Sequence, residues 1–234
     1  MNALTEPHTR KLIIAVDGPA GAGKSTIAAR LARKLGYVNL ESGAMYRALA
    51  LKAIQNDISF DDESALAALA DNSQIQLEPT INGNRVLLDG MDVTLRVREP
   101  DVTEAASRVS IHPKVREWMV SHQRALGIKG GVVMEGRDIG TKVFPDADLK
   151  IFLDADPVVR EQRRLEQQRQ KGITSASSST SIAAEIRERD HRDRGRELAP
   201  LRQASDAMSV DASMLSADQV VKLMKQRIES ESRQ

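Results

Sequence analysis

A glycine-rich segment that joins a buried strand to an amphipathic helix limits the folds open to this chain. Residues 12–16 (LIIAV) form a short, largely β-branched apolar run, which is typical of a strand buried on both faces. Residues 18–25 (GPAGAGKS) follow and match the pattern G-x-x-x-x-G-K-[ST], and apolar residues then recur at helical spacing as far as residue 35. The pattern therefore stands in the strand–loop–helix context that its chemistry requires.

This loop has the chemistry of a phosphate-binding site. Its glycines let backbone N–H groups turn inward around an anion, and the following helix adds its positive N-terminal end. Lys24 is expected to reach the β- and γ-phosphates of a nucleoside triphosphate, Ser25 to bind Mg²⁺, and Thr26 to contact the α-phosphate. The predicted triphosphate-binding residues are Gly18, Pro19, Ala20, Gly21, Ala22, Gly23, Lys24, Ser25 and Thr26.

The alternation of strands and helices predicts an α/β fold. Short buried runs recur at residues 132–134, 149–153 and 207–210, and a helix is expected between or after them. Asp156 and Pro157 resemble an N-cap followed by a first helical turn, and Ser216 with Gln219 resembles a capping box. We expect a parallel sheet that is flanked by helices on both faces.

Residues 60–100 break this alternation. A short helix is expected at 61–70, followed by strands at 74–77, 85–89 and 91–94 around the hairpin signal Asn82-Gly83-Asn84. We interpret the segment as a small α+β lobe inserted into a core of residues 11–59 and 101–234. Helical spacing returns at 101–110 and 113–126.

Two further segments have a distinct composition. Residues 1–10 lack the apolar stretch of a signal peptide and are expected to be a flexible tail. Charged helices at about 160–197 are predicted to form a helical lid, and the serine-rich residues 175–181 between them fit its tip or a disordered surface loop equally well.

Composition excludes several classes of protein. The chain has no cysteine, so disulfides, thiolate zinc sites and cysteine nucleophiles are excluded, and no apolar run approaches the roughly 20 residues of a membrane span. With 34 basic and 33 acidic residues the net charge is +1, which argues against a general nucleic-acid-binding surface. We expect a cytoplasmic monomer without nucleic-acid or membrane partners. An anionic small molecule is still indicated, because six arginines crowd one stretch: Arg187, Arg189, Arg192, Arg194, Arg196 and Arg202.

The phosphate loop alone leaves kinases, GTPases, ATPase motors and nucleotide-dependent regulators open. The chain contains no N-K-x-D motif, which a GTPase uses to recognise guanine, and 234 residues are few for a motor. Three other segments narrow the choice: residues 40–47 (LESGAMYR), 135–140 (EGRDIG), and 188–196 (ERDHRDRGR) with Ala199-Pro200-Leu201 after it. With these segments the chain resembles the bacterial cytidylate kinases, a family of nucleoside monophosphate kinases, over about residues 12–228. The resemblance implies transfer of a phosphoryl group from ATP, with Mg²⁺, to CMP or dCMP.

The resemblance also implies roles for residues on the acceptor side. Ser42 is expected to hydrogen-bond cytosine, and Arg47 to bind the monophosphate. Arg137 and Asp138 follow a buried strand, where ligand clefts form in parallel sheets, and are expected to recognise the base and its phosphate neighbourhood. The predicted CMP-binding residues are Ser42, Arg47, Ser107, Arg116, Arg137, Asp138, Arg189, Asp193 and Arg196.

The expected catalytic residues come from the loop and from the charged helices. If residues 188–196 are helical, positions 189, 193 and 196 share one face. The resemblance implies that Arg189 and Arg196 clamp phosphates while Asp193 contacts the acceptor sugar. Arg163 resembles a lid arginine near the transferring phosphoryl group. Glu135 stands where the family usually has aspartate, and it is expected to position a Mg²⁺-bound water. The predicted catalytic residues are Lys24, Arg163, Arg189 and Arg196.

Two alternative functions stay open at this point. The first is another small P-loop kinase, acting on UMP, AMP or a non-nucleotide such as shikimate; Ser42, Arg137 and Asp138 argue against it. The second is a nucleotide-dependent regulator or nucleic-acid-binding protein, which the balanced charge and the spacing around Arg189 disfavour.

Overall fold

A computed structural model describes residues 11–80, 83–170 and 179–231. The predicted tail at 1–10 and residues 175–178 of the serine-rich segment lie outside the described residues.

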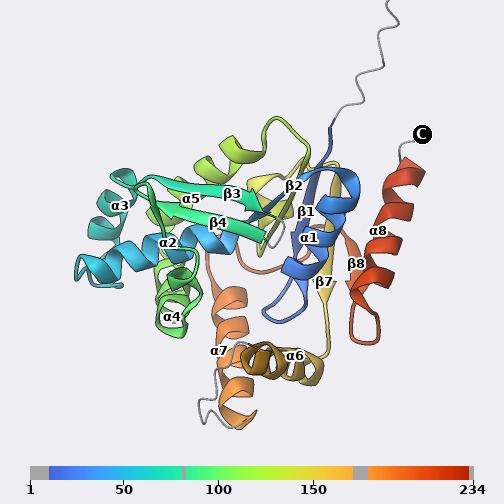
Figure 1. The fold of residues 1–234 in the computed structure, drawn as a ribbon. Coiled ribbons are helices and arrows are strands. Elements are labelled where there is room, and N and C mark those ends of the chain that lie inside the picture. Colours follow the sequence, from blue (N-terminus) through green and yellow to red (C-terminus); the bar gives the residue numbers. More distant parts are fainter. Residues whose placement is uncertain (1–10, 81–82, 171–178, 232–234) are drawn as a thin grey trace, which may run out of the picture.

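The centre of the fold is a five-stranded parallel sheet with the order β2-β6-β1-β7-β8 (Figure 1). This confirms the α/β expectation. The edge strand β2 was not predicted, because its four residues carry only two apolar side chains and Val38 is exposed. The strands are β1 Ile13–Asp17, β2 Val38–Glu41, β6 Val132–Gly136, β7 Leu149–Asp154 and β8 Met208–Asp211.

Helices cover both faces of this sheet, so its strands have two separate apolar cores. Ile14 and Val16 of β1 point into a core with α1 and α8, whereas Ala15 between them joins a second core with α2, α4 and α5. The alternation follows from the two-residue side-chain period of a strand. The bounds are α1 Lys24–Leu35, α2 Ser42–Gln55, α4 Pro100–Val109, α5 Pro113–Gly127 and α8 Ala217–Glu231.

A separate antiparallel sheet with the order β3-β4-β5 lies where the inserted lobe was predicted. Asn84, which is buried in β4, attaches it to the main sheet. Its Oδ1 accepts from Glu41 N at 2.8 Å and its Nδ2 donates to Asn39 O at 2.8 Å. The lobe is therefore anchored directly before Ser42. Its elements are α3 Glu63–Asp71, β3 Ile75–Thr80, β4 Gly83–Leu88, β5 Met91–Asp92 and a 3₁₀ turn at Arg96–Arg98.

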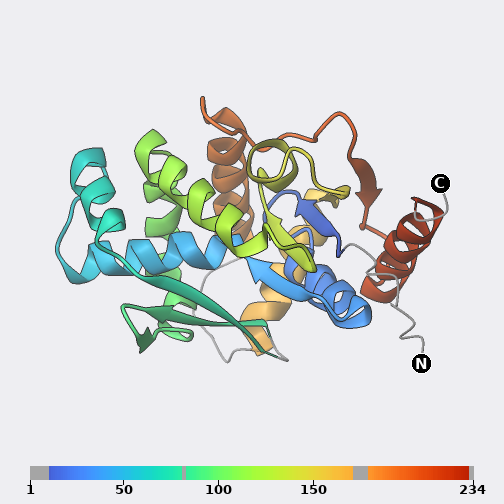
Figure 2. The same ribbon diagram turned by 90° about the horizontal axis from the view of Figure 1, so that it is seen from above.

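Two charged helices, α6 Pro157–Gln170 and α7 Ser179–Gly195, lie side by side at the bottom of Figure 1. Both predicted caps are present: Val158 N donates to Asp156 Oδ1 at 2.8 Å, and the backbone and side chains of Ser216 and Gln219 bond each other reciprocally. Figure 2 shows α3 and α8 at opposite ends of the molecule. Within the described ranges, no helix is long and apolar enough to cross a membrane.

Candidate active site

One cavity opens at the carboxyl ends of β1, β2 and β6, between the phosphate loop and the charged helices. Its walls include six residues of the loop, namely Ala20, Gly21, Gly23, Lys24, Ser25 and Thr26. They also include all nine residues predicted for the acceptor side: Ser42, Arg47, Ser107, Arg116, Arg137, Asp138, Arg189, Asp193 and Arg196. Gly18, Pro19 and Ala22 do not line it. Tertiary folding therefore brings the predicted donor and acceptor residues to the same space.

The loop conformation depends on its glycines. Gly18 has φ 150°, and a Cβ there would lie 1.9 Å from the carbonyl oxygen of Leu153 in the neighbouring strand. Gly21 and Gly23 also have positive φ, at 77° and 101°. Only glycine adopts these angles without steric cost, so the amides can follow the curve of a phosphate-binding nest.

Lys24 is buried in this loop. Its Nζ donates to the carbonyl oxygen of Pro19 at 2.7 Å. The pKa of Lys24 is lowered to about 7, mainly by burial and next by repulsion from Arg137, while the carboxylate of Glu135 opposes the shift. An anion in the cavity would stabilise the protonated amine and raise this pKa.

Glu135, at the end of β6, connects the two sides of the cavity. Its Oε1 accepts from the Ser25 hydroxyl at 2.7 Å, and its backbone oxygen accepts from the Ser42 hydroxyl at 2.7 Å. Ser25 and Glu135 supply oxygen ligands of the kind that Mg²⁺ prefers. Among the described residues, no group of three or more histidine, cysteine or acidic side chains is placed to hold a metal ion. Two protein oxygen donors suit an ion that takes its other ligands from phosphates and water.

Asp138 and Arg116 form a buried ion pair in the acceptor wall, with Arg116 Nη2 at 2.5 Å from Asp138 Oδ2. Arg116 Nη1 also donates to Ser110 O at 3.0 Å, and its guanidinium lies 5.7 Å from the centroid of the Tyr46 ring. Burial raises the pKa of Tyr46 to about 12, so its phenol stays neutral. These contacts hold Arg116, and through it Asp138, in place at the cavity wall.

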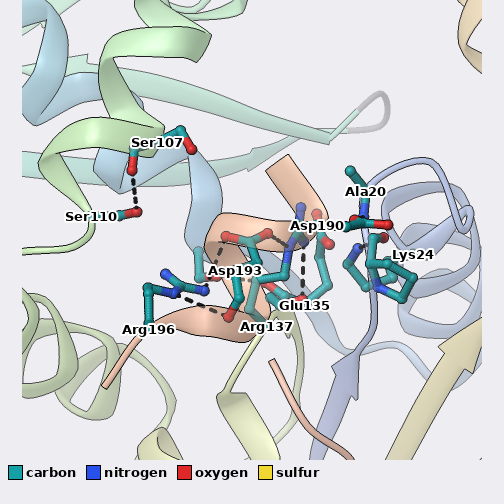
Figure 3. Close-up of polar contacts among 12 residues, drawn as sticks. Ala20, Lys24, Ser107, Ser110, Glu135, Arg137, Asp190, Asp193 and Arg196 are labelled. Carbon is teal, nitrogen blue, oxygen red and sulfur yellow. Dashed lines mark hydrogen bonds and ion pairs between the residues drawn. The ribbon is translucent and has the colours of Figure 1, made fainter. Parts of the chain in front are cut away.

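Asp193 of α7 organises the arginines of the opposite wall (Figure 3). Its Oδ2 accepts from Arg137 Nε at 2.7 Å, and its Oδ1 lies 3.1 Å from Arg196 Nη2. Burial alone would raise the pKa of Asp193, but the positive charges of Arg137, Arg196 and Arg189 outweigh it and hold the pKa below its usual range. Burial, followed by repulsion from Arg137, lowers the pKa of Arg189 to about 10. The wall therefore carries an excess of positive charge that suits phosphate.

Several polar atoms in the wall are buried with no hydrogen-bond partner in the described part of the chain: Arg47 Nε, Ser107 Oγ and Arg116 Nε. Arg47 does pair through Nη2 with Glu41 Oε1 at 2.5 Å. Buried polar groups in folded proteins are nearly always satisfied, so such atoms in a cavity wall are natural partners for a ligand.

Comparison with known proteins decides which family this site belongs to. The family model described as cytidylate kinase matches residues 14–230. The chain is 49% identical to the cytidylate kinase of Enterococcus faecalis, over 90% of this chain and 92% of that protein. It is 44% identical to the cytidylate kinase of Solibacter usitatus, over 96% of this chain and 97% of that protein.

The chain belongs to the cytidylate kinase family. It is therefore an ATP-dependent nucleoside monophosphate kinase, which is a phosphotransferase. Among solved structures, an uncharacterized protein from Eubacterium ventriosum superposes with a TM-score of 0.53 at 12% identity, covering 94% of this chain and 99% of that chain. At this identity the likeness concerns the fold alone.

Two neighbouring arginines of α6 have different surroundings, and only one of them lines the cavity. Arg163, the predicted lid arginine, donates to Ala22 O at 3.2 Å and to Ala212 O at 2.6 Å, and it does not line the cavity. Arg164, the next residue, does line it. Arg163 was predicted from the resemblance, whereas Arg164 was not among the predicted residues. Both lie on the same charged helix, and the directions of their side chains depend on how that helix docks.

Other lining residues were not among the predicted site residues. Glu41, Gly43, Tyr46 and Gly136 stand within or beside the recognised motifs, so their neighbourhood was a usable signal. Ala106, Ser110, Gln167, Glu185 and Ile186 carry no such signal and reach the cavity only through the packing of α4, α6 and α7.

Proposed function

We propose that this cavity transfers the γ-phosphoryl group of ATP to CMP or dCMP, giving ADP and the nucleoside diphosphate, with Mg²⁺ as cofactor. The observation that carries the proposal is the shared cavity: the phosphate loop and all nine acceptor-side residues line one space. Membership in the cytidylate kinase family supports the same acceptor.

The donor side comprises the phosphate loop and the first turn of α1. Backbone amides of the loop and Lys24 hold the β- and γ-phosphates, and Thr26 contacts the α-phosphate. Ser25 and Glu135 would hold Mg²⁺, Ser25 through its hydroxyl and Glu135 through a water. When bound, the ion neutralises charge that develops on the phosphate oxygens.

The acceptor side recognises base, sugar and phosphate with different groups. Ser42 and Asp138 hydrogen-bond the cytosine, and Arg116 keeps Asp138 in place through their ion pair at 2.5 Å. Arg47, Arg189 and Arg196 bind the phosphate. Asp193 contacts the sugar, because its carboxylate accepts one hydrogen bond from Arg137 and forms an ion pair with Arg196, and so keeps further lone pairs for a hydroxyl.

The reaction needs no catalytic base. The attacking group is a phosphate oxygen, which is already anionic near neutral pH. The obstacle is the repulsion between two polyanions, and Lys24, Arg137 and Arg189 reduce it because they bring fixed positive charge into a site with little water. Arg163 and Arg164 are both candidates for the arginine beside the transferring phosphoryl group, and the position of Arg164 in the cavity wall favours it.

We also propose a role for each segment of the chain. Residues 11–59 and 101–234 form the kinase core, residues 60–100 the lobe beside the acceptor, and the helices at about 160–197 a lid that excludes water during transfer. We further propose a cytoplasmic monomer that has neither nucleic-acid nor membrane partners. The nearly balanced charge of the chain supports the absence of a nucleic-acid partner.

A panel assay tests the proposed acceptor. ADP release would be measured with ATP and Mg²⁺ against CMP, dCMP, UMP, AMP, GMP and shikimate. We expect strong turnover with CMP and dCMP, weaker turnover with the others, and loss of all turnover when EDTA removes the metal. Equal rates across the panel would contradict the proposed preference for CMP and dCMP.

Replacement of Asp138 by asparagine tests base recognition. An amide keeps the volume and can donate to the uracil oxygen that replaces the cytosine amine, so we expect the CMP/UMP ratio of kcat/KM to fall about tenfold or more. Asparagine is preferable to alanine, because its amide oxygen can still accept a hydrogen bond from the buried Arg116, whereas alanine would remove the charge and the acceptor together. An unchanged ratio in a variant that melts like the wild type would refute the role of Asp138.

A further inference from the structure

The helices α6 and α7 meet the phosphate loop through a buried ion pair that has no part in the proposed chemistry. Arg160 of α6 donates through Nη1 to Asp190 Oδ2 of α7 at 2.5 Å, and the two residues are only 5% and 8% exposed. Neither lines the cavity. A buried pair of charges is costly unless further hydrogen bonds satisfy both groups, so the other partners of this pair are informative.

The backbone N–H and C=O groups of one loop residue, Ala20, both form hydrogen bonds with this ion pair. Arg160 Nη1 donates to Ala20 O at 3.1 Å, and Ala20 N donates to Asp190 Oδ1 at 3.3 Å. Figure 3 shows Asp190 beside Ala20, next to Lys24. The contact is also steric, because a Cβ at Gly21 would lie 3.1 Å from the Cβ of Arg160.

These bonds fix two successive peptide planes of the loop. In a trans peptide the C=O and N–H groups point to opposite sides. The plane between Pro19 and Ala20 is held at one end by Lys24, whose Nζ donates to Pro19 O at 2.7 Å, and at the other end by Asp190. The next plane is held at Ala20 O by Arg160, so the direction of the Gly21 N–H is determined as well.

We propose that Arg160 and Asp190 are positioning residues for the donor site: the pair orients the Pro19–Ala20 and Ala20–Gly21 peptides, so that the loop is already shaped for a triphosphate. The inference rests on the proposed function only in taking ATP as the ligand of the loop. The pair is neutral as a whole, so it orders the amides without adding a net charge that would repel the phosphates. Its loss should weaken ATP binding and leave CMP binding largely intact, because within the described residues the hydrogen bonds of the two side chains go to Ala20, to Ala155 and to each other, and none of them goes to an acceptor residue.

The test replaces the pair by apolar residues of similar volume, Arg160→Met with Asp190→Leu, in the full chain. Such replacements of buried ion pairs commonly keep or raise stability, so the melting temperature separates folding from positioning. Isothermal titration with ATP and Mg²⁺ should give a Kd about tenfold higher or more, as expected for the loss of a charge-assisted hydrogen bond. The Kd of CMP, titrated separately, should stay at the wild-type value.

A matched control removes a different ion pair from α7. Arg192 Nε lies 3.5 Å from Glu188 Oε1, and neither side chain lines the cavity. Arg192→Gln with Glu188→Gln is expected to bind ATP as the wild type does.

Two results would overturn the inference: a folded double variant with wild-type ATP affinity, or equal weakening of ATP and CMP binding. If the double variant does not fold, Asp190→Asn serves instead, with weaker ATP binding expected and wild-type binding counting against the pair. ATP titration is independent of CMP turnover, so failure of the proposed reaction in the wild-type panel assay is distinguishable from failure of this inference.

Discussion

Replacement of Lys24 by alanine is expected to lower kcat with ATP and CMP by roughly 10²- to 10³-fold or more. Lys24 is the cation within the loop, and its amine stands 2.7 Å from Pro19 O, where a bound triphosphate would replace or share that contact. Loss of a fixed charge near the transferring group removes stabilisation that exists mainly in the transition state, so kcat falls together with kcat/KM. Steady-state kinetics with saturating ATP would measure the effect.

The fold should survive this replacement. Burial lowers the pKa of Lys24 to about 7, which means that the folded chain carries a cost for the charged amine near neutral pH, and alanine removes it. Lys34→Ala, on the exposed last turn of the same helix, is the matched control and should turn over like the wild type. If Lys24→Ala kept near wild-type kcat, the assignment of the loop as the donor site would be wrong.

Replacement of Arg189 by alanine is expected to lower kcat by roughly 10³-fold, by analogy with arginines that stabilise phosphoryl transfer. Arg189 faces the cavity from α7 beside Asp193, and burial together with the charge of Arg137 lowers its pKa to about 10. A guanidinium that is poorly solvated and repelled by its neighbours is strongly stabilised when a phosphate binds beside it. Single-turnover measurements of phosphoryl transfer would separate this effect from product release.

The melting temperature of Arg189→Ala shows whether a loss of turnover comes from a loss of folding. Because neighbouring arginines repel it, its removal should not lower the melting temperature. Arg194→Ala, on the exposed side of the same helix, is expected to leave kcat unchanged. A folded Arg189→Ala enzyme with wild-type turnover would remove α7 from the proposed catalytic machinery.

The parts of the fold that follow from local chemistry were predictable. Residues 12–16 are apolar on both faces, which predicts a buried strand. The glycines at 18, 21 and 23 have the positive φ angles that a phosphate-binding loop needs. Prediction failed for β2. Its sequence V-N-L-E alternates apolar and polar residues, but with only two apolar side chains the signal is short, and pairing with β6 fixes it as a strand.

Seven of the nine proposed acceptor residues lie in three short motifs, and Ser107 and Arg116 were named from the resemblance alone. The contacts among these residues could not be predicted. Arg137 pairs with Asp193, which is 56 positions away, and Arg116 pairs with Asp138. With 34 basic and 33 acidic residues, sequence spacing cannot select these partners. Whether Arg163 or Arg164 lines the cavity depends in the same way on how α6 is rotated against the loop.

The sequence by itself determined the strand, the glycine loop and Lys24, because backbone angles and apolar burial are properties of a few consecutive residues. Only the tertiary structure decided what surrounds that loop. Parallel pairing of β2, β1 and β6 sets their carboxyl ends together and so places Ser42, Ser25 and Glu135 in one hydrogen-bonded chain. Docking of α6 and α7 then brings Arg160 and Asp190 onto Ala20. Such contacts depend on distances between elements that are far apart along the chain, and no local pattern encodes them.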